Sequence, residues 1–254
     1  MVKVLISGCN GHMGRVVADI CKARSDVEVV GGFDILGQGD GSFPIWSNPA
    51  LCHAEAQVVI DFSSPAALES LLTFGQERKI PLVLATTGYS EEQLSAIDQA
   101  AQNIPIFRSG NLSLGINVLM ELVKRCASLL GEDYDVEIVE RHHNRKVDAP
   151  SGTALMLYEA AAQGLPYQPH PVYDRQSVRQ RRDPHEIGIS AVRGGNIVGD
   201  HEVIFAGRDE VVELKHSAMS REVFASGAVK AACFLAGVEK PGLYNMNDLV
   251  SAVL

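Results

Sequence analysis

The chain has 254 residues and a formal net charge of -9 at pH 7. This length suits one large domain or two smaller ones, and a hydrophobic content of 46% can supply a substantial core. The acidic balance argues against a general nucleic-acid or anionic-membrane surface, and no apolar run approaches the roughly 20 residues that span a bilayer. The five cysteines lack C-x-x-C spacing and the first residues lack a signal-peptide pattern, so a cytoplasmic setting is expected.

The first half of the chain alternates short β-branched runs with segments of helical periodicity. Helix starts are marked by Ser64 before Pro65 and by Ser90 three residues before Gln93. Strands that are apolar on both faces and alternate with helices predict a doubly wound parallel sheet of Rossmann type over residues 1–112. The expected strands are 2–8, 27–33, 56–64, 80–88 and 104–111, and the expected helices are 12–24, 64–78 and 90–102.

The pattern changes after residue 112. An amphipathic helix at 114–130 leads into a strand at 134–143, and a further helix begins at Ser151. A charged, proline-containing stretch at 163–186 is expected to be an extended loop, whose arginine run is a solvated or subunit-contact segment rather than a ligand site. Three strands joined by glycine turns follow over 187–218. We predict an α+β domain at 113–219 with a mixed or antiparallel sheet, and residues 220–254 are expected to complete the first domain.

The glycine-rich stretch "ISGCNGHMGR" lies between the first strand and the first helix. Gly8, Gly11 and Gly14 provide an open turn and a close backbone approach, and the following helix start offers N–H donors to a pyrophosphate. The spacing is G-x-x-G-x-x-G rather than the usual G-x-G-x-x-G. The alternative is that these glycines only pack a strand against a helix.

An acidic residue ends the second predicted strand. Asp34 follows the glycine stretch by about 20 residues, where an acid accepts hydrogen bonds from the adenosine ribose hydroxyls. A 2′-phosphate needs a cation beside this acid, and the residues that follow it, "ILGQGDG", contain none. This favours NADH over NADPH, unless Arg15 or a residue distant in sequence supplies the cation.

A second polar stretch, "ERHHNRKVDAPSGTA", spans residues 140–154. It gathers His142, His143 and Lys146 immediately before the helix that starts at Ser151. A helix start with hydroxyl side chains suits a carboxylate, and a histidine suits proton delivery near neutral pH. The stretch therefore indicates an anion-binding and proton-donating site. The alternative is a solvated basic loop before an ordinary capped helix.

The segment "EIVERHHNRKVDAPSGTA" resembles the signature of the dihydrodipicolinate reductase family. "VLISGCNGHMGR", "PLVLATTGYS", "RSGNLSLGINVL" and "AVRGGNIVGDHEVIFAG" extend the resemblance over nearly the whole chain. The resemblance implies a Rossmann-type domain joined to an α+β domain that binds substrate and builds a homotetramer. It also implies NAD(P)H-dependent reduction of 4-hydroxy-tetrahydrodipicolinate, a small heterocyclic dicarboxylate, in the diaminopimelate route to lysine.

The resemblance also implies roles for individual residues. His142 and Lys146 match the catalytic proton donors, His143 matches a substrate-binding position, and Gly152 with Thr153 match the pair that holds a substrate carboxylate. No metal is expected, because the two adjacent histidines point to opposite faces of a strand. The positions that match the cofactor site are Gly8, Cys9, Asn10, Gly11, His12, Met13, Asp34, Ala85, Thr86, Thr87, Ser109, Gly110, Asn111 and Leu112.

Three positions depart from the family pattern. His12 stands where an arginine is common, and Ala85 replaces a glycine. Ile35 replaces the basic residue of members that accept NADPH well, which again favours NADH. Arg221 is either a further carboxylate contact or an ordinary surface cation.

Two other classes of function remain open on this reading. One is another NAD-dependent amino-acid oxidoreductase, such as an aspartate dehydrogenase, for which the doubled histidine and "KVDAPSGT" are not expected. The other is a non-catalytic dinucleotide sensor with an anionic effector, which has no need of His142 and Lys146 as proton donors.

Overall fold

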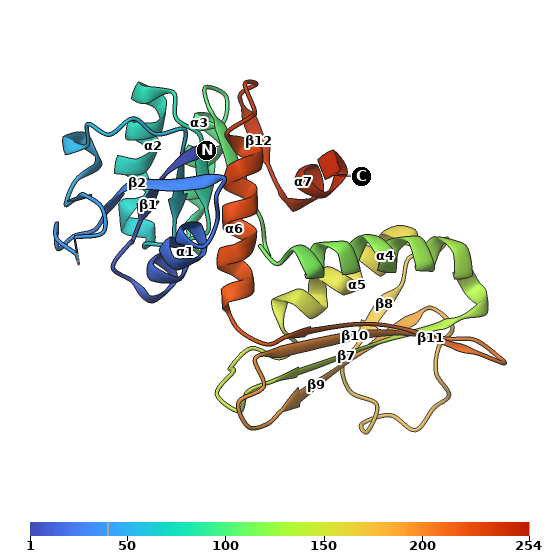
Figure 1. The fold of residues 1–254 in the computed structure, drawn as a ribbon. Helices are drawn as coiled ribbons and strands as arrows, with labels where there is room; N and C mark the ends of the chain where they lie inside the picture. The colour runs from blue at the N-terminus through green and yellow to red at the C-terminus, as the bar shows by residue number, and fades with distance from the viewer. Residues whose placement is uncertain (40, 254) are drawn as a thin grey trace. The chain divides into compact units, whose positions relative to one another are not determined.

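The computed structural model describes residues 1–39 and 41–253, and the chain forms two compact units (Figure 1). The first unit comprises Met1–Ser113 together with the C-terminal segment from Glu222, and the second comprises Leu114–Arg221. Of the described helices, none combines the length and the apolar character needed to cross a bilayer.

The first unit is built on seven parallel strands in the order β12-β6-β5-β4-β1-β2-β3. From β3 to β6 this is the doubly wound order, which confirms the predicted Rossmann-type sheet. The two edge strands were not predicted, because runs of two and three residues carry no readable periodicity. The strands are β1 (Val2–Ser7), β2 (Val27–Phe33), β3 (Ile45–Trp46), β4 (Val58–Asp61), β5 (Leu82–Leu84), β6 (Pro105–Arg108) and β12 (Gly242–Tyr244).

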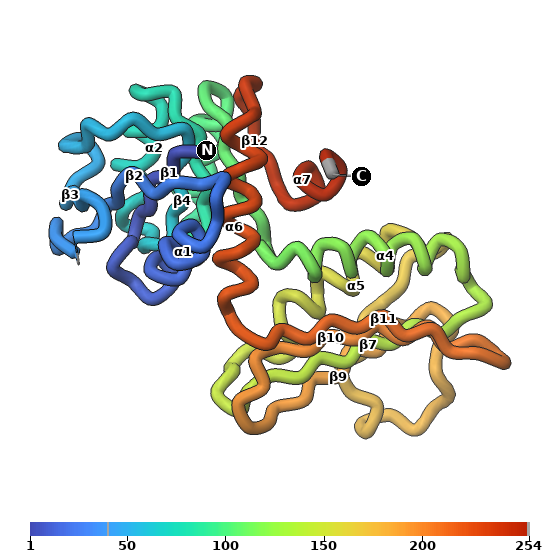
Figure 2. Tube along the Cα trace, viewed as in Figure 1, coloured from blue at the N-terminus to red at the C-terminus, as the bar shows by residue number. Residues whose placement is uncertain are grey.

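Helices cover both faces of this sheet, as Figure 2 shows along the chain trace. Helices α1 (His12–Lys22) and α6 (Glu222–Leu235) pack together on one face. Helices α2 (Leu68–Arg78) and α3 (Glu91–Ala100) bury their apolar faces on the other, in a core that includes Leu5, Val59 and Leu82. The last helix is α7 (Met246–Val253), which was not predicted.

The second unit has a five-stranded mixed sheet in the order β11-β10-β7-β9-β8. β7 pairs antiparallel with β10 but parallel with β9, and β10 pairs antiparallel with β11. One face of the sheet packs against α4 (Leu114–Leu130) and α5 (Gly152–Gly164) in a core centred on Ile138, Val203 and Phe205. The strands are β7 (Asp135–His142), β8 (His170–Val172), β9 (Glu186–Arg193), β10 (Gly199–Ala206) and β11 (Val211–Ala218).

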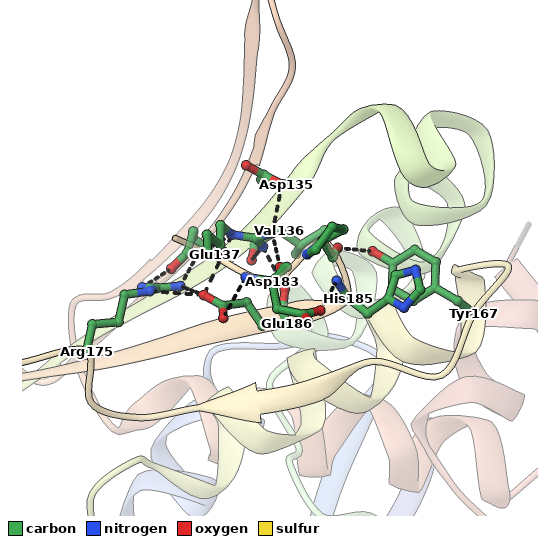
Figure 3. A network of polar contacts seen from close by, with 10 residues as sticks. Asp135, Val136, Glu137, Tyr167, Arg175, Asp183, His185 and Glu186 are labelled. Carbon is green, nitrogen blue, oxygen red and sulfur yellow. Dashed lines mark hydrogen bonds and ion pairs between the residues drawn. The ribbon is translucent and has the colours of Figure 1, made fainter. Parts of the chain in front are cut away.

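The segment expected to be an extended loop contains β8 and is tied to the sheet by ion pairs (Figure 3). Arg175 donates to Glu137 and to Glu186, each at 2.6 Å. Arg182 donates to Asp135 at 2.7 Å and to Glu137 at 3.2 Å. The ends of the arginine run therefore contact carboxylates of their own unit, while the residues between them are exposed.

Candidate active site

The glycine turn between β1 and α1 has the backbone geometry that a dinucleotide loop requires. Gly8 adopts φ +74°, and a Cβ there would lie 2.6 Å from the carbonyl oxygen of Phe62. A Cβ on Gly14 would lie 2.1 Å from the carbonyl oxygen of Gly8. Both positions exclude a side chain, because the turn packs between β4 and the first turn of the helix.

A pocket of about 450 Å³ lies beside this turn, at the carboxyl edge of the sheet. Gly8, Gly11, Asp34, Ile35 and Ser63 are among its lining residues. α1 begins at His12 with Gly11 at its N-cap, so the positive end of the helix dipole adjoins the turn. The glycine geometry and this helix start fit the pyrophosphate and ribose of a dinucleotide. His12 is exposed and Met13 is half-buried in the first helical turn.

The carboxylate of Asp34 joins the glycine turn to the end of β2. It accepts hydrogen bonds from the backbone N–H groups of Asn10 and Leu36, each at 3.2 Å. The side-chain amide of Asn10 donates a hydrogen bond to the backbone carbonyl of Gln38 at 2.9 Å. The Cys9 thiol is buried, and burial with the nearby Asp34 charge raises the pKa of Cys9 to about 11. This thiol is therefore a neutral packing group.

The segment after β5 is held by a buried carboxylate that the sequence analysis missed. Asp61, at the end of β4, is 1% exposed. It accepts hydrogen bonds from Thr86 Oγ1 at 2.7 Å, from Ser63 Oγ at 2.5 Å and from Tyr89 Oη at 3.3 Å. Burial, followed by the Asp61 charge, raises the pKa of Tyr89. Ala85 donates its N–H to the Asp61 carbonyl at 2.9 Å, and Thr87 continues the segment. The sequence signal that could have indicated Asp61 is its position, since an acid at the carboxyl end of a parallel strand lies where such sheets bind ligands.

The segment after β6 forms the third part of this edge. Ser109 Oγ donates to the carbonyl of Asn111 at 3.1 Å, and the Asn111 side chain accepts from the Ser113 N–H at 2.8 Å. Gly110 lies between them, and Leu112 is buried. A Cβ on Gly227 of α6 would lie 1.7 Å from the Leu112 carbonyl oxygen, so α6 packs directly on this segment. The residues predicted for the cofactor thus gather along one sheet edge.

In the second unit, the residues predicted to act on the substrate gather where β7 ends and α5 begins. His142 is buried at the end of β7, and its Nδ1 lies 2.5 Å from Oε2 of Glu140. Arg193 donates to both oxygens of Glu140 at 2.7 Å, and the N–H of Ser151 donates to it at 3.0 Å. The sequence analysis named neither Glu140 nor Arg193. The alternation of β7 could have indicated Glu140, because residues 140 and 142 share a face.

A second buried histidine lies beside the first. The rings of His201 and His142 are 5.1 Å apart between centroids and nearly perpendicular. His201 Nε2 lies 2.9 Å from Ser151 Oγ, which also caps α5 by accepting from the Ala154 N–H at 3.2 Å. Burial, followed by the neighbouring His142, lowers the pKa of His201 to about 4. His201 is therefore neutral at pH 7.

The loop between β7 and α5 carries the remaining substrate candidates. Lys146 Nζ donates to both carboxylate oxygens of Asp148 at 2.7 Å, and this contact lowers the pKa of Asp148. Arg221 lies 3.5 Å from Nε2 of His143, and desolvation followed by nearby cations lowers the pKa of His143.

Gly152 and Thr153 form the first turn of α5, at the positive end of its dipole. Apart from its chain neighbours and the backbone of its own helix, no described atom lies within 4 Å of a Cβ built on Gly152, so a ligand can approach this backbone closely. Over the described residues, no group of three or more His, Cys, Asp or Glu is arranged to hold a metal ion.

The parallel sheet and the glycine turn before α1 define a protein with a Rossmann-type, dinucleotide-binding domain. Residues 2–112 match the family model described as dihydrodipicolinate reductase, N-terminus, and residues 115–250 match the model for its C-terminus. The chain belongs to the dihydrodipicolinate reductase family.

Named relatives cover the chain almost completely. A 4-hydroxy-tetrahydrodipicolinate reductase of Caldanaerobacter subterraneus subsp. tengcongensis is 54% identical over 98% of each chain. The enzyme of the same name from Clostridium tetani is 48% identical, over 99% of this chain and 98% of its own. A dipicolinate-bound dihydrodipicolinate reductase from Paenisporosarcina sp. TG-14 has the same fold, with a TM-score of 0.79, 24% identity, and coverage of 97% of this chain and 99% of its own.

Proposed function

We propose that this protein catalyses the NAD(P)H-dependent reduction of 4-hydroxy-tetrahydrodipicolinate to tetrahydrodipicolinate in the diaminopimelate route to lysine. The observation that carries the proposal is the buried His142 held by Glu140 beside the start of α5, in a member of this family. This arrangement combines a proton donor with an anion-binding helix start, which reduction of an unsaturated dicarboxylate requires.

The chain's own residues bind the substrate and manage the proton. The 4-hydroxyl of the substrate leaves as water, and the nicotinamide, when bound, supplies the hydride that saturates one carbon–carbon bond of the ring. Hydride addition leaves negative charge on the ring system, and His142 neutralises it by giving up the proton on Nε2. Lys146 acts as the second proton donor and carboxylate contact, and it exchanges Asp148 for the substrate when the substrate binds. His143 is a further substrate contact.

The chemistry of the substrate suits the start of α5. A dicarboxylate needs two positively polarised contacts, and Gly152 with Thr153 provide one at the helix dipole while Lys146 provides the other. The Paenisporosarcina structure with dipicolinate, a planar heterocyclic dicarboxylate, supports this choice of substrate class.

NADH is the proposed preferred cofactor, with NADPH as the weaker alternative. Asp34 is the acid that meets the adenosine ribose, and its charge repels a 2′-phosphate. Ile35, at 91% exposure, offers no cation to offset that repulsion. The glycine turn from Gly8 to Met13 and the segments 85–87 and 109–112 are proposed to hold the pyrophosphate and the nicotinamide half.

The proposed assembly is a homotetramer in the cytoplasm. The face of the second sheet opposite α4 and α5 carries half-buried apolar side chains, among them Val139 and Ile204, and the exposed Val192. A second copy of this face is the proposed partner. The five cysteines are free thiols, as a reducing compartment favours. Sedimentation velocity, which gives the molar mass in solution, tests the assembly.

The experiment that tests the function is NADH oxidation with substrate generated enzymatically from pyruvate and aspartate semialdehyde. It is run beside NADPH and beside the variants His142→Gln and Lys146→Ala. Activity in the wild type, with kcat lowered about 100-fold or more in His142→Gln, supports the proposal. Binding of NADH without turnover would leave the dinucleotide site standing and refute the proposed reaction.

A further inference from the structure

Among the residues that the structure describes, the imidazole of His142 is held by a hydrogen bond at one nitrogen, Nδ1. Its Nδ1 lies 2.5 Å from Oε2 of Glu140, and the side chain of Glu140 is wholly buried. β7 places the two residues on the same face, because side chains of a strand alternate and these positions differ by two. This contact therefore follows from the strand itself and not from a flexible loop.

Glu140 is ionised and accepts four hydrogen bonds. Arg193 reaches both of its oxygens at 2.7 Å, while His142 and the Ser151 N–H take one oxygen each. Burial alone raises the pKa of Glu140, but the hydrogen bonds from Arg193, His142 and Ser151 together outweigh burial, and the net pKa is lowered. Because an ionised carboxylate only accepts hydrogen bonds, Nδ1 of His142 must carry a proton.

Over the described residues, the other nitrogen, Nε2, has no hydrogen-bond partner in the protein. A Cβ on Gly199 of β10 would lie only 3.0 Å from Nε2 of His142, so glycine makes room for the ring in this orientation. The neighbouring His201 presents its own Nε2 to Ser151 and is neutral at pH 7, so it places no like charge beside His142. Nε2 is therefore the nitrogen that exchanges a proton with a ligand.

The same carboxylate also connects the proton donor to the ligand-binding helix. Its contact with the Ser151 N–H fixes the residue that caps α5. Arg193 additionally donates to the Asp148 carbonyl at 2.7 Å, which fixes the loop that carries Lys146. Displacement of Glu140 would therefore disturb the orientation of the donor and the position of the helix start together.

We propose that Glu140 is the positioning residue of the active site, which holds His142 in the Nδ1–H tautomer and directs Nε2 to the substrate. This rests on the proposed function for the identity of the reaction, but the tautomer itself does not depend on any substrate. Throughout the reaction Nδ1 keeps its proton and donates it in the hydrogen bond to Glu140. Only the proton on Nε2 is transferred.

The first test reads the tautomer in the wild-type protein without substrate. Ring nitrogens are observed by NMR in protein labelled with nitrogen-15 at histidine, and the His142 signals are assigned from their loss in His142→Gln. At a pH where the ring is neutral, protonated Nδ1 and unprotonated Nε2 are expected. The opposite tautomer, which free histidine prefers, would overturn the proposal without any variant having to fold.

The second test uses Glu140→Gln with Glu137→Gln as the matched control. In Glu140→Gln the amide N–H₂ faces Nδ1 and donates to it, so the neutral ring is expected to carry its proton on Nε2. Glu137 lies on the same strand and also pairs with an arginine, but it occupies the opposite face. Its variant is expected to keep the wild-type tautomer and a kcat within about twofold of wild type.

The kinetic readout separates positioning from binding. In Glu140→Gln the glutamine oxygen can keep the contacts with the Ser151 N–H and Arg193, so the start of α5 stays in place while the orientation of the proton donor is lost. For the proposed reaction kcat is therefore expected to fall about 100-fold while KM for the dicarboxylate changes much less. Equal losses in the two variants, or a lower affinity with unchanged kcat, would contradict the proposal. If the wild type lacks this activity, the proposed function fails while the tautomer measurement still decides the role of Glu140.

Discussion

The carboxylate of Asp61 accepts a hydrogen bond of 2.7 Å from the hydroxyl of Thr86, so the carboxyl ends of β4 and β5 are joined side chain to side chain. The same carboxylate holds Ser63 and Tyr89. A buried acid with this many donors sets the position of the segment after β5, where the nicotinamide half of the cofactor is proposed to bind.

Asp61→Asn is therefore expected to weaken NADH binding and to lower stability. An amide at this position turns an acceptor into a donor that faces the hydroxyls of Ser63 or Thr86, at a cost of about 1–3 kcal/mol. NADH affinity, measured from the fluorescence of the bound dinucleotide, and the melting temperature should both fall. Asp98→Asn, an exposed acid on α3, serves as the control and should change neither. Full retention of NADH affinity in Asp61→Asn would argue against this role.

Gly8→Ala is expected to lose cofactor affinity and stability for two separable reasons. Positive φ disfavours alanine by about 1–2 kcal/mol, and the added Cβ also meets the Phe62 carbonyl. Gly131→Ala isolates the first effect, because Gly131 also has positive φ but, apart from its chain neighbours, no described atom within 4 Å of a Cβ built there. Urea unfolding and NADH titration of both variants should show a larger loss of stability for Gly8→Ala, and a loss of affinity only there.

Ile35→Arg is expected to raise kcat/KM for NADPH by about 10-fold, which corresponds to about 1.4 kcal/mol of added interaction. The side chain adjoins Asp34 and the pocket beside the glycine turn, so a guanidinium there can meet a 2′-phosphate. Because Ile35 is almost fully exposed, the substitution removes little packing, and activity with NADH should stay near wild type. An unchanged cofactor ratio in steady-state kinetics would show that another residue controls the preference.

His201 is expected to make the protein sensitive to acid below pH 6.5. Its folded-state pKa of about 4 lies below its ordinary value of 6.5, so in that window the unfolded chain binds a proton that the folded chain does not. Stability is therefore lost as pH falls from 6.5 towards 4, and above 6.5 this group contributes no pH dependence. The loss at pH 5 amounts to about 2 kcal/mol.

The measurement is urea unfolding of wild type and His201→Gln at pH 7.5 and pH 5, at fixed protein concentration. The glutamine amide can keep the contact with Ser151 but does not titrate. The variant should therefore lose about 2 kcal/mol less than wild type between the two pH values. Identical losses would show that other groups dominate the acid response.

Regular periodicity made the Rossmann-type unit predictable from sequence. Long β-branched runs and capped helices, such as the one that Ser90 opens with a complete capping box, carry their own local signals. β12 and α7 follow α6 near the C-terminus, and the three residues of β12 are too few to show a period. The mixed pairing of β7 with β9 and β10 depends on contacts between residues far apart in the chain.

In the candidate site too, residues with a local sequence signal could be predicted and residues that depend on distant contacts could not. Residues that local motifs single out, such as Gly8 and His142, could be named in advance. Arg193 could not, because its ion pair with Glu140 joins positions separated by 53 residues and needs the parallel pairing of β7 with β9. The contact between Lys146 and Asp148 is local, but nothing in their spacing shows that the lysine is paired.

The carboxylate of Glu137 binds both ends of the arginine run at residues 175–182. Arg175 and Arg182 both donate to Oε1 of Glu137, and residues 176–181 between them are exposed. A trypsin-like protease that cleaves after Arg179 would cut the covalent chain but leave the two flanking arginines, Arg175 and Arg182, bound to the same side chain. The nicked protein would then separate into two fragments under denaturing conditions while it keeps its native mass in solution.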